Sequence, residues 1–308
     1  MKLQFNQLVW APTVALVGKT VMNYDGLEEA VEQMGAVDAA EKDGTPLNNL
    51  MARVALDGGN GDDLAEFAGR QCYRSWTAGR DSAEYHRNIR SQGHGSIYEH
   101  GFLSFQVTGV SRTLTHELVR HGEGTGISQE SQRYVDAKDM RFVIPPLLAN
   151  AIIAEVGYTP TCISDIIDID NAGVRDAFNL FYASCSKSLE DYIALQPLLV
   201  AMAKEAEAAS IIGDDKAVVS AKKRANEAAR SVLHNACETR LVWSMNLRAS
   251  RHIMLMRGDE PADLEIRRLS AEFFPHVVGY APHLFADLSI ETGSDNLPII
   301  TTSEAKRL

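Results

Sequence analysis

Long helical stretches alternate with isolated strand-like segments along this chain, and that alternation constrains the fold most. Residues 171–212 and 216–236 are Ala-rich, as is typical of long helices. Residues 101–108 and 239–246 instead alternate apolar and polar side chains with the period of a half-buried strand. We therefore predict an α+β fold in which a mixed or antiparallel sheet packs against long helices.

Shorter segments extend this framework. Further helices are predicted at 63–76, 82–91, 111–121, about 246–257 and 261–286, and short strands at 13–18, which we expect to be buried, and 141–145. Ser111 and Asn246 are suited to cap the helices that they begin. Gly93 is expected to end a helix, and Gly109 to break the strand that precedes it.

We predict one domain over residues 1–308. Residues 22–60 are expected to form an irregular or partly helical surface excursion, because most of this stretch is acidic, contains glycine and has weak periodicity. The polar residues 287–308 are expected to form a loose tail. No internal repeat or clear linker divides the chain.

Composition excludes several classes of protein. The net charge of −11 and the pI near 5.3 argue against a nucleic-acid or membrane-surface binder, which usually carries a basic field. The N-terminus lacks the pattern of a signal peptide, and no apolar run has the length of a membrane span. The four cysteines lack metal-ligand spacing, so we expect no metal site and a reduced cytoplasmic setting. Cys72 is expected to be buried, because its neighbours on the predicted helix include Phe67 and Ala68.

The segment RHGEGTGISQESQRYV, residues 120–135, carries the most chemical information. Glycines let a backbone approach a ligand closely, and hydroxyls with backbone N–H groups can surround phosphate oxygens. Arg133 can add a bidentate, charge-assisted contact to such an anion. Composition alone is equally compatible with a solvated surface loop, expected here at 122–134.

The Arg-His pair of RHG and the following SQESQRYV resemble the signature of the flavin-dependent thymidylate synthases. The resemblance continues in order through EFAGRQCYRSW, GHGSIYEHGFLSFQVTGVSRTLTHELVRH, ARSVLHNACETRLVWSMNLRASRHIMLMRGDEPADLEIRRL and APHLFADL. It covers about residues 64–146 and 222–287. It implies the fold of the thymidylate synthase-complementing proteins and an enzyme that methylates dUMP to dTMP.

The resemblance also implies the partners of the reaction. FAD, reduced by NADPH, supplies the hydride, and 5,10-methylenetetrahydrofolate supplies the carbon. The family is homotetrameric, with sites shared between subunits. Residues that match dUMP-binding positions are Glu117, Gln129, Ser131, Gln132, Arg133, Arg230 and Arg257, of which Arg257 and Ser131 are the catalytic candidates.

Eight residues match FAD-binding positions: His94, Ser96, Glu99, Arg120, His121, Asn246, Arg248 and His252. Arg248 and His252 are four apart, and so lie on one face of the predicted helix. His94 and Tyr134 are candidates to frame a stacked flavin or folate ring. Arg251, which is out of phase with Arg248, is expected at the surface.

Three positions depart from the family pattern. Gly122 stands where the family usually has an arginine that helps to hold the flavin, and one extra residue lies between His121 and Ser128. His234 stands where the family usually has proline. Two alternatives therefore stay open: a dUMP hydroxymethylase, in which water meets the transferred methylene, and a catalytically weak protein that binds FAD or nucleotide.

Overall fold

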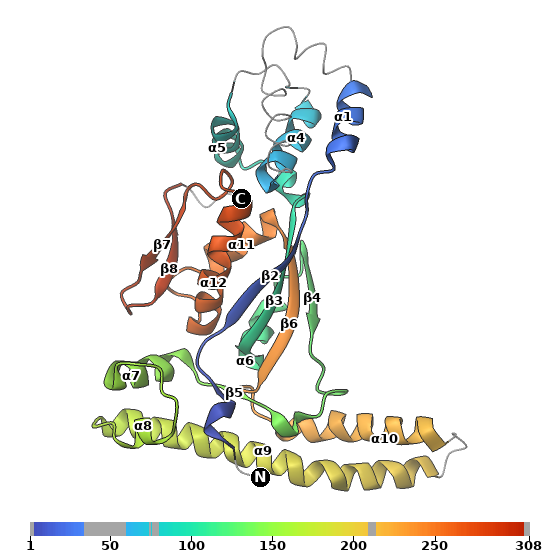
Figure 1. Ribbon diagram of the computed structural model, residues 1–308, viewed down its shortest axis with the longest axis vertical. Helices are drawn as coiled ribbons and strands as arrows, with labels where there is room; N and C mark the ends of the chain where they lie inside the picture. The colour runs from blue at the N-terminus through green and yellow to red at the C-terminus, as the bar shows by residue number, and fades with distance from the viewer. Residues whose placement is uncertain (1–2, 34–59, 74, 76–79, 209–213, 305–308) are drawn as a thin grey trace. The chain divides into compact units, whose positions relative to one another are not determined.

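The computed structural model describes residues 3–33, 60–73, 75, 80–208 and 214–304 and has the α+β fold that the sequence predicts (Figure 1). Its described residues belong to two compact units interleaved along the chain. The first, called the helical unit, comprises residues 1–12, 108–118 and 128–241. The second, called the pocket unit, comprises residues 13–107, 119–127 and 242–308. The single domain predicted over 1–308 stays a prediction.

A four-stranded sheet has the strand order β2 (Thr13–Lys19), β3 (Phe102–Ser111), β6 (Glu238–Asn246), β4 (Thr125–Gln129). The backbone N–H of Thr20 donates to the carbonyl of Phe102 at 2.9 Å, so the end of β2 meets the start of β3. The Ser104 and Ser244 hydroxyls lie 2.7 Å apart, and further along β3 the backbone N–H of Arg112 donates to Cys237 O. Residue numbers thus rise along β3 as they fall along β6, so the two strands run in opposite directions. The predicted antiparallel arrangement is confirmed for these strands.

Strand β3 continues past Gly109, contrary to the prediction that this glycine ends it. Gly109 has a φ of +71°, and a Cβ there would lie 2.5 Å from the carbonyl oxygen of Ala11. Its N–H donates to the carboxylate of Glu238 at 2.9 Å. The glycine thus permits a local change of backbone direction within the strand. Ser111 then caps α6 (Arg112–Leu118) by accepting from Leu114 N at 3.1 Å, as predicted.

Strand β4 lies inside the stretch 122–134 that was predicted to be a loop, and that prediction is wrong for 125–129. Glu130 N donates to Arg240 O at 2.8 Å, and Asn246 N donates to Gly124 O at 2.9 Å, so β4 pairs with β6 in antiparallel orientation. The strand carries no apolar alternation, and its residues are half-buried or exposed. Pairing with β6, rather than burial, therefore specifies this strand, which is why periodicity missed it.

The helical unit is built around two long helices, α9 (Ala172–Ala208) and α10 (Asp214–Ala229), which lie side by side in Figure 1. It also holds α7 (Pro146–Val156), α8 (Ser164–Ile167) and the parallel two-stranded pair β1 (Leu8–Val9) and β5 (Phe142–Val143). Short 3-10 turns lie at Phe5–Gln7, Ala137–Asp139 and Arg230–Val232. Its core is apolar and includes Phe142, Ile152, Phe178, Cys185, Leu189 and Cys237.

The pocket unit packs helices α11 (Leu247–Arg257) and α12 (Leu264–Tyr280) together, with α12 also against β2. It contains α1 (Tyr24–Gln33), α4 (Gly61–Tyr73), α5 (Ser82–Gln92) and the 3-10 turn Gly95–Glu99. Phe105, Trp243 and Phe273 form an edge-to-face aromatic cluster in its core. Strand β2 is not the buried strand that was predicted, because Val17 is 59% exposed.

The predicted excursion at 22–60 is helical over α1, and residues 34–59 lie outside the described part of the chain. Gly93 ends α5 with a φ of +69°, as predicted. Among the residues that the structure describes, no helix combines the length and apolarity that crossing a bilayer requires.

The predicted loose tail is wrong for the described residues up to 304. Strands β7 (Leu288–Thr292) and β8 (Pro298–Thr302) form an antiparallel hairpin. Ile300 N donates to Gly258 O at 2.8 Å, so the hairpin is tied to the end of α11. The polar composition of this segment concealed the hairpin. Hydrogen bonds and ion pairs to distant residues supplement its few buried apolar side chains, Leu288, Leu297 and Ile300.

Arg251 is the centre of one such contact and is buried, not at the surface as predicted. Its two Nη groups donate to the carboxylate of Asp287 at 2.8 and 2.7 Å, and Nη1 also donates to Leu284 O at 3.1 Å. Thr302 of β8 donates to the same carboxylate. Arg251 follows Arg248 by three residues and so leaves a neighbouring side of α11, from which its side chain extends to the C-terminal segment.

Breaking this buried pair should destabilise the protein strongly. We expect Asp287→Ala to lower the free energy of unfolding by about 3–5 kcal/mol, because it leaves the Arg251 guanidinium buried and uncompensated. The exposed pair Lys187–Asp191 on α9 is the control, and Lys187→Ala should cost less than about 0.5 kcal/mol. Urea unfolding followed by circular dichroism measures both; equal effects would contradict this account.

Candidate functional site

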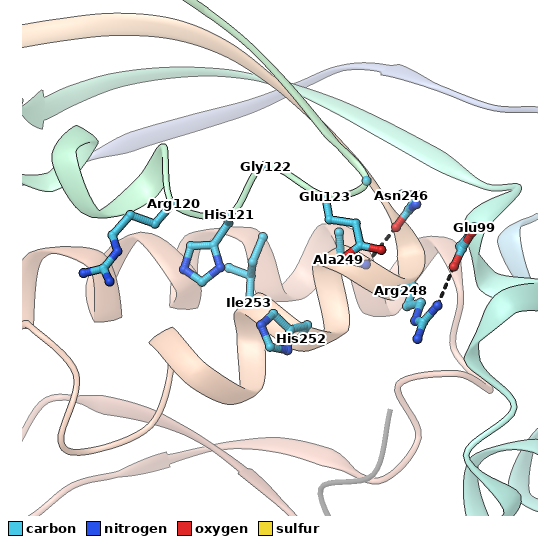
Figure 2. Close-up of a pocket in the computed structure, with 11 residues that line it drawn as sticks. Glu99, Arg120, His121, Gly122, Glu123, Asn246, Arg248, Ala249, His252 and Ile253 are labelled. Carbon is cyan, nitrogen blue, oxygen red and sulfur yellow. Dashed lines mark hydrogen bonds and ion pairs between the residues drawn. The ribbon is translucent and has the colours of Figure 1, made fainter.

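A pocket of about 390 Å³ opens in the pocket unit between residues 120–124 and the first turns of α11. Figure 2 shows Arg120 and His121 on the loop side and Asn246, Arg248 and His252 on the helix side. Together with Glu99, these are six of the eight residues that the sequence assigned to FAD, and all of them line this one pocket. Its volume lies within the range of roughly 300–1,000 Å³ usual for small-molecule sites.

The helix side of the pocket is formed by the N-terminus of α11. Asn246 caps this helix, as predicted, because its side chain accepts from Ala249 N at 2.8 Å. Arg248 and His252 project from its first two turns and are exposed. A capped helix N-terminus carries partial positive charge, and an adjacent arginine adds to it. This end of α11 therefore suits an anionic group such as a diphosphate.

Arg248 is paired with Glu99, which lies at the end of the Gly95–Glu99 turn. Both side chains are about half exposed, at 46% each. An ion pair this accessible contributes little to stability and is readily exchanged for another partner. Arg248 is therefore available to an anion that enters the pocket (Figure 2).

Arg257, at the last turn of α11, contacts the loop through His121. Its Nε donates to His121 Nε2 at 2.8 Å, so that nitrogen of the imidazole is unprotonated. Burial lowers the pKa of His121, and the neighbouring charges of Arg257, His252 and Arg120 lower it further. His121 and His252 rings pack edge to face with their centroids 5.9 Å apart. The contact between Arg257 and His121 thus favours the neutral imidazole and orients the Arg257 guanidinium.

The loop between His121 and Ser128 contains two of the three departures from the family pattern. A Cβ placed on Gly122 would meet nothing within 4 Å, so the position has room for a larger side chain. Gly124 has a φ of +68°, and a Cβ there would lie 2.6 Å from the Asn246 amide. Only glycine at 124 lets the loop pass so close to the cap of α11. Glu123, which the sequence did not single out, brings a carboxylate to the pocket wall.

A second pocket, of about 290 Å³, shares Arg248 with the first. The two remaining FAD candidates, His94 and Ser96, line it. The His94 ring stacks with Tyr73, with 6.1 Å between centroids and 19° between planes. Cys72 also lines this pocket and is exposed, so the prediction that it is buried is wrong. It stands near the end of α4, where helical spacing gave no signal of exposure.

Six of the seven dUMP candidates lie in the helical unit: Glu117, Gln129, Ser131, Gln132, Arg133 and Arg230; Arg257 alone lies in the pocket unit. Ser131 begins a turn, because its carbonyl accepts from Tyr134 N and Val135 N, and its hydroxyl accepts from Arg133 N at 3.4 Å. Gln132 is buried in this turn. Arg133 extends to Glu227 of α10, with which it forms an ion pair.

Arginines gather on this side of the helical unit. Arg230 is exposed where α10 passes into the 3-10 turn Arg230–Val232. Burial lowers the pKa of Arg112, and the charge of Arg230 contributes to that shift. Arg112 donates to Glu130 O at 2.9 Å and so holds the segment just before Ser131. Arg112 was not among the sequence candidates, because its supporting contact is made to a backbone carbonyl.

The remaining candidates of the helical unit have local partners. Gln129 donates to Thr239 Oγ1 at 3.1 Å and to Thr115 Oγ1 at 3.3 Å, whereas Glu117 lies half-buried on α6. Tyr134 is 66% exposed. Lys223 Nζ and Arg133 Cζ lie 5.0 and 5.8 Å from its ring centroid. His94 and Tyr134 therefore belong to different units and have different ring partners, and their joint stacking role stays a prediction.

A family model and individual relatives point to the same family. The model of the family described as thymidylate synthase complementing protein matches residues 55–283. The flavin-dependent thymidylate synthase of Mycobacterium tuberculosis (strain H37Rv) is 37% identical over 250 residues, 80% of this chain and 87% of that protein. The flavin-dependent thymidylate synthase of Mycobacterium avium is 38% identical over 252 residues, 80% of this chain and 88% of that protein.

A solved structure is also similar. It is thymidylate synthase X from Helicobacter pylori with FAD and dUMP, 20% identical, with a TM-score of 0.46 over 73% of this chain and 93% of that chain. At that TM-score the likeness carries no argument about the site.

Replacing Arg257 should change the titration of His121. We expect Arg257→Ala to raise the pKa of His121 toward its ordinary value of about 6.5, because a neighbouring positive charge is removed while the burial remains. NMR titration of the histidine ring carbons measures it. An unchanged or lower pKa would contradict the contact.

The same shift predicts a pH effect on the wild type. Because the folded state binds this proton less readily than the unfolded state, the contribution of His121 to stability is complete above about pH 6.5 and is lost as the pH falls below it.

Proposed function

The chain belongs to the thymidylate synthase complementing protein family, and on that premise we propose that it methylates dUMP to dTMP as a flavin-dependent thymidylate synthase. FAD, reduced by NADPH, is the hydride source, and 5,10-methylenetetrahydrofolate is the carbon donor. One observation carries the proposal: all eight residues that match FAD-binding positions line two pockets that share Arg248. The fold thus brings three separate segments, 94–99, 120–121 and 246–252, to two pockets that meet at Arg248.

The donor set of the two pockets fits FAD. The N-terminus of α11, with Arg248 and Arg120, supplies positive charge for the diphosphate, and Asn246 supplies an amide. His252 and the stacked His94–Tyr73 pair supply flat surfaces for the rings. When bound, FAD supplies the hydride that reduces the transferred carbon, and the protein supplies position and charge.

The nucleotide is assigned to the turn that carries Ser131. Arg133 and Arg230 provide two cations for the phosphate, and the Ser131 hydroxyl and nearby backbone provide donors. Gln129 and Gln132 are assigned to the base or sugar, and Glu117 to the sugar hydroxyl. Ser131 acts by binding, since no base pairs with its hydroxyl among the described residues.

Arg257 is assigned to the edge of the uracil ring. A fixed cation there stabilises the negative charge that develops on the ring as C5 becomes nucleophilic. His121 accepts the Arg257 Nε hydrogen and so fixes the plane of the guanidinium. The neutral state of His121 keeps that hydrogen bond intact at physiological pH.

The assembly proposed from the family is a homotetramer with shared sites, in the cytoplasm, without nucleic-acid or membrane partners. Leu147, Leu180, Leu198 and Met202 of the helical unit are each more than 60% exposed. Large exposed apolar side chains on a helix surface are common where subunits meet. They support an oligomer and do not specify its size.

Two alternatives remain, a dUMP hydroxymethylase and a weakly catalytic FAD- or nucleotide-binding protein. Products distinguish the three proteins, since the hydroxymethylase forms 5-hydroxymethyl-dUMP and the binding protein forms neither product.

We expect the protein to form dTMP from dUMP, methylenetetrahydrofolate and NADPH with added FAD. Arg133→Ala should lower kcat/KM by roughly 30- to 150-fold, the effect of about 2–3 kcal/mol for a charged hydrogen bond. Arg87→Ala, which removes an exposed arginine of α5 outside both pockets, is the control and should be neutral. Chromatography of the products tests this; 5-hydroxymethyl-dUMP as the product would overturn the proposal.

Gly122→Arg should tighten FAD binding by roughly tenfold. The position has room for the side chain, and a third cation near Arg120 and Arg248 offsets the Glu123 carboxylate. Gly279→Arg adds the same charge on α12 outside both pockets and should leave the affinity unchanged. Quenching of flavin fluorescence measures both dissociation constants, and equal effects of the two substitutions would contradict the assignment of this loop to the flavin.

A further inference from the structure

Arg133 is held by α10 at two points. Its Nε donates to Glu227 Oε1, and the carbonyl oxygen of Arg133 accepts from Asn226 Nδ2 at 3.4 Å. Asn226 is buried and is itself fixed from α9, because Gln196 Nε2 donates to its Oδ1 at 3.1 Å. Two consecutive residues of one helix thus fix both the backbone and the side chain of Arg133.

Glu227 accepts from one N–H group of Arg133, and the position of that group decides which N–H groups remain for an anion. A guanidinium carries five N–H groups, and those on the two Nη atoms form the outer edge that meets a phosphate bidentately. Glu227 takes only the Nε hydrogen. Within the part of the chain that the structure describes, the Arg133 side chain donates no other hydrogen bond, and it remains 42% exposed. The outer edge is therefore open to an anion.

Glu227 also relates Arg133 to the second phosphate candidate. Arg230 follows it by three residues, at the start of the 3-10 turn that continues α10, a spacing that brings two side chains to one side of a helical segment. Glu227 is 32% exposed, so its carboxylate lies beside the arginines rather than in the core. Lys223, one turn earlier, lies over the Tyr134 ring and adds positive charge to the same side. The surrounding cations offset the repulsion between Glu227 and a phosphate.

We propose that Glu227 is a positioning residue for the nucleotide phosphate. It fixes the plane of the Arg133 guanidinium through Nε and directs the two Nη groups outward, so that both can contact the anion. This inference rests on the proposed function, which makes the phosphate of dUMP the anion. The fixed orientation lowers the conformational entropy that Arg133 loses on binding.

An opposing role for the same contact makes the inference testable. If Glu227 instead occupied Arg133 in place of the phosphate, every substitution that removed its charge would tighten nucleotide binding. A positioning role depends on the acceptor oxygen rather than the charge. Glu227→Gln keeps an acceptor oxygen of the same reach, whereas Glu227→Ala removes it.

The experiment is a calorimetric titration of the full-length protein with dUMP. We expect Glu227→Gln to stay within about threefold of the wild type and Glu227→Ala to bind at least tenfold more weakly, the effect of one charged hydrogen bond. Glu205→Ala, an exposed glutamate on α9, is the control and should not change the affinity. In an Arg133→Ala background, Glu227→Ala should cause no further loss, because there is no guanidinium left to orient.

Each outcome supports or overturns the inference. Tighter binding by both Glu227 variants, or no change in either, overturns it. A loss that persists undiminished in the Arg133→Ala background also overturns it, because the effect would then be a general loss of structure. A wild type that binds dUMP but forms no dTMP overturns the proposed function alone. A wild type that binds no dUMP overturns both.

Discussion

The junction between β6 and α11 determines the geometry of the first pocket, which residues 120–124 and the start of α11 line. Asn246 is the last residue of the strand and the cap of the helix: its backbone N–H donates to Gly124 O at 2.9 Å, and its side chain accepts from Ala249 N at 2.8 Å. One residue therefore ties the loop side of the pocket to its helix side. Because Gly124 passes so close to this amide, a side chain at 124 would separate the two walls.

Neighbouring sides of α11 make contacts of different kinds. Arg248 and His252 face the pocket, where they are exposed and exchangeable, whereas Arg251 is buried and fixed by Asp287. The C-terminal hairpin reinforces this anchor through Thr302 and through the backbone bond between Ile300 and Gly258. The buried Arg251–Asp287 contact thus holds α11 to the C-terminal segment, while Arg248 and His252 line the pocket.

Periodicity and capping residues were sufficient to predict α11, β6 and the helix pair α9 and α10. The grouping of the flavin candidates was implied by the family resemblance instead. Periodicity and capping residues failed where stability comes from distant partners. Strand β4 is specified by pairing with β6, the C-terminal hairpin by hydrogen bonds and ion pairs, and the burial of Arg251 by Asp287. The place of Glu123 on the pocket wall and the pairing of Glu227 with Arg133 could not be predicted either, because a lone glutamate gives no sign of which cation it will meet.

The central claim is that FAD binds against the N-terminus of α11 and residues 120–124. A crystal structure of the protein with FAD and dUMP tests it most directly. The account predicts the FAD diphosphate at the first turn of α11, with Arg248 turned from Glu99 to the phosphates. Electron density for FAD at any site that excludes Asn246, Arg248 and His252 would contradict the account.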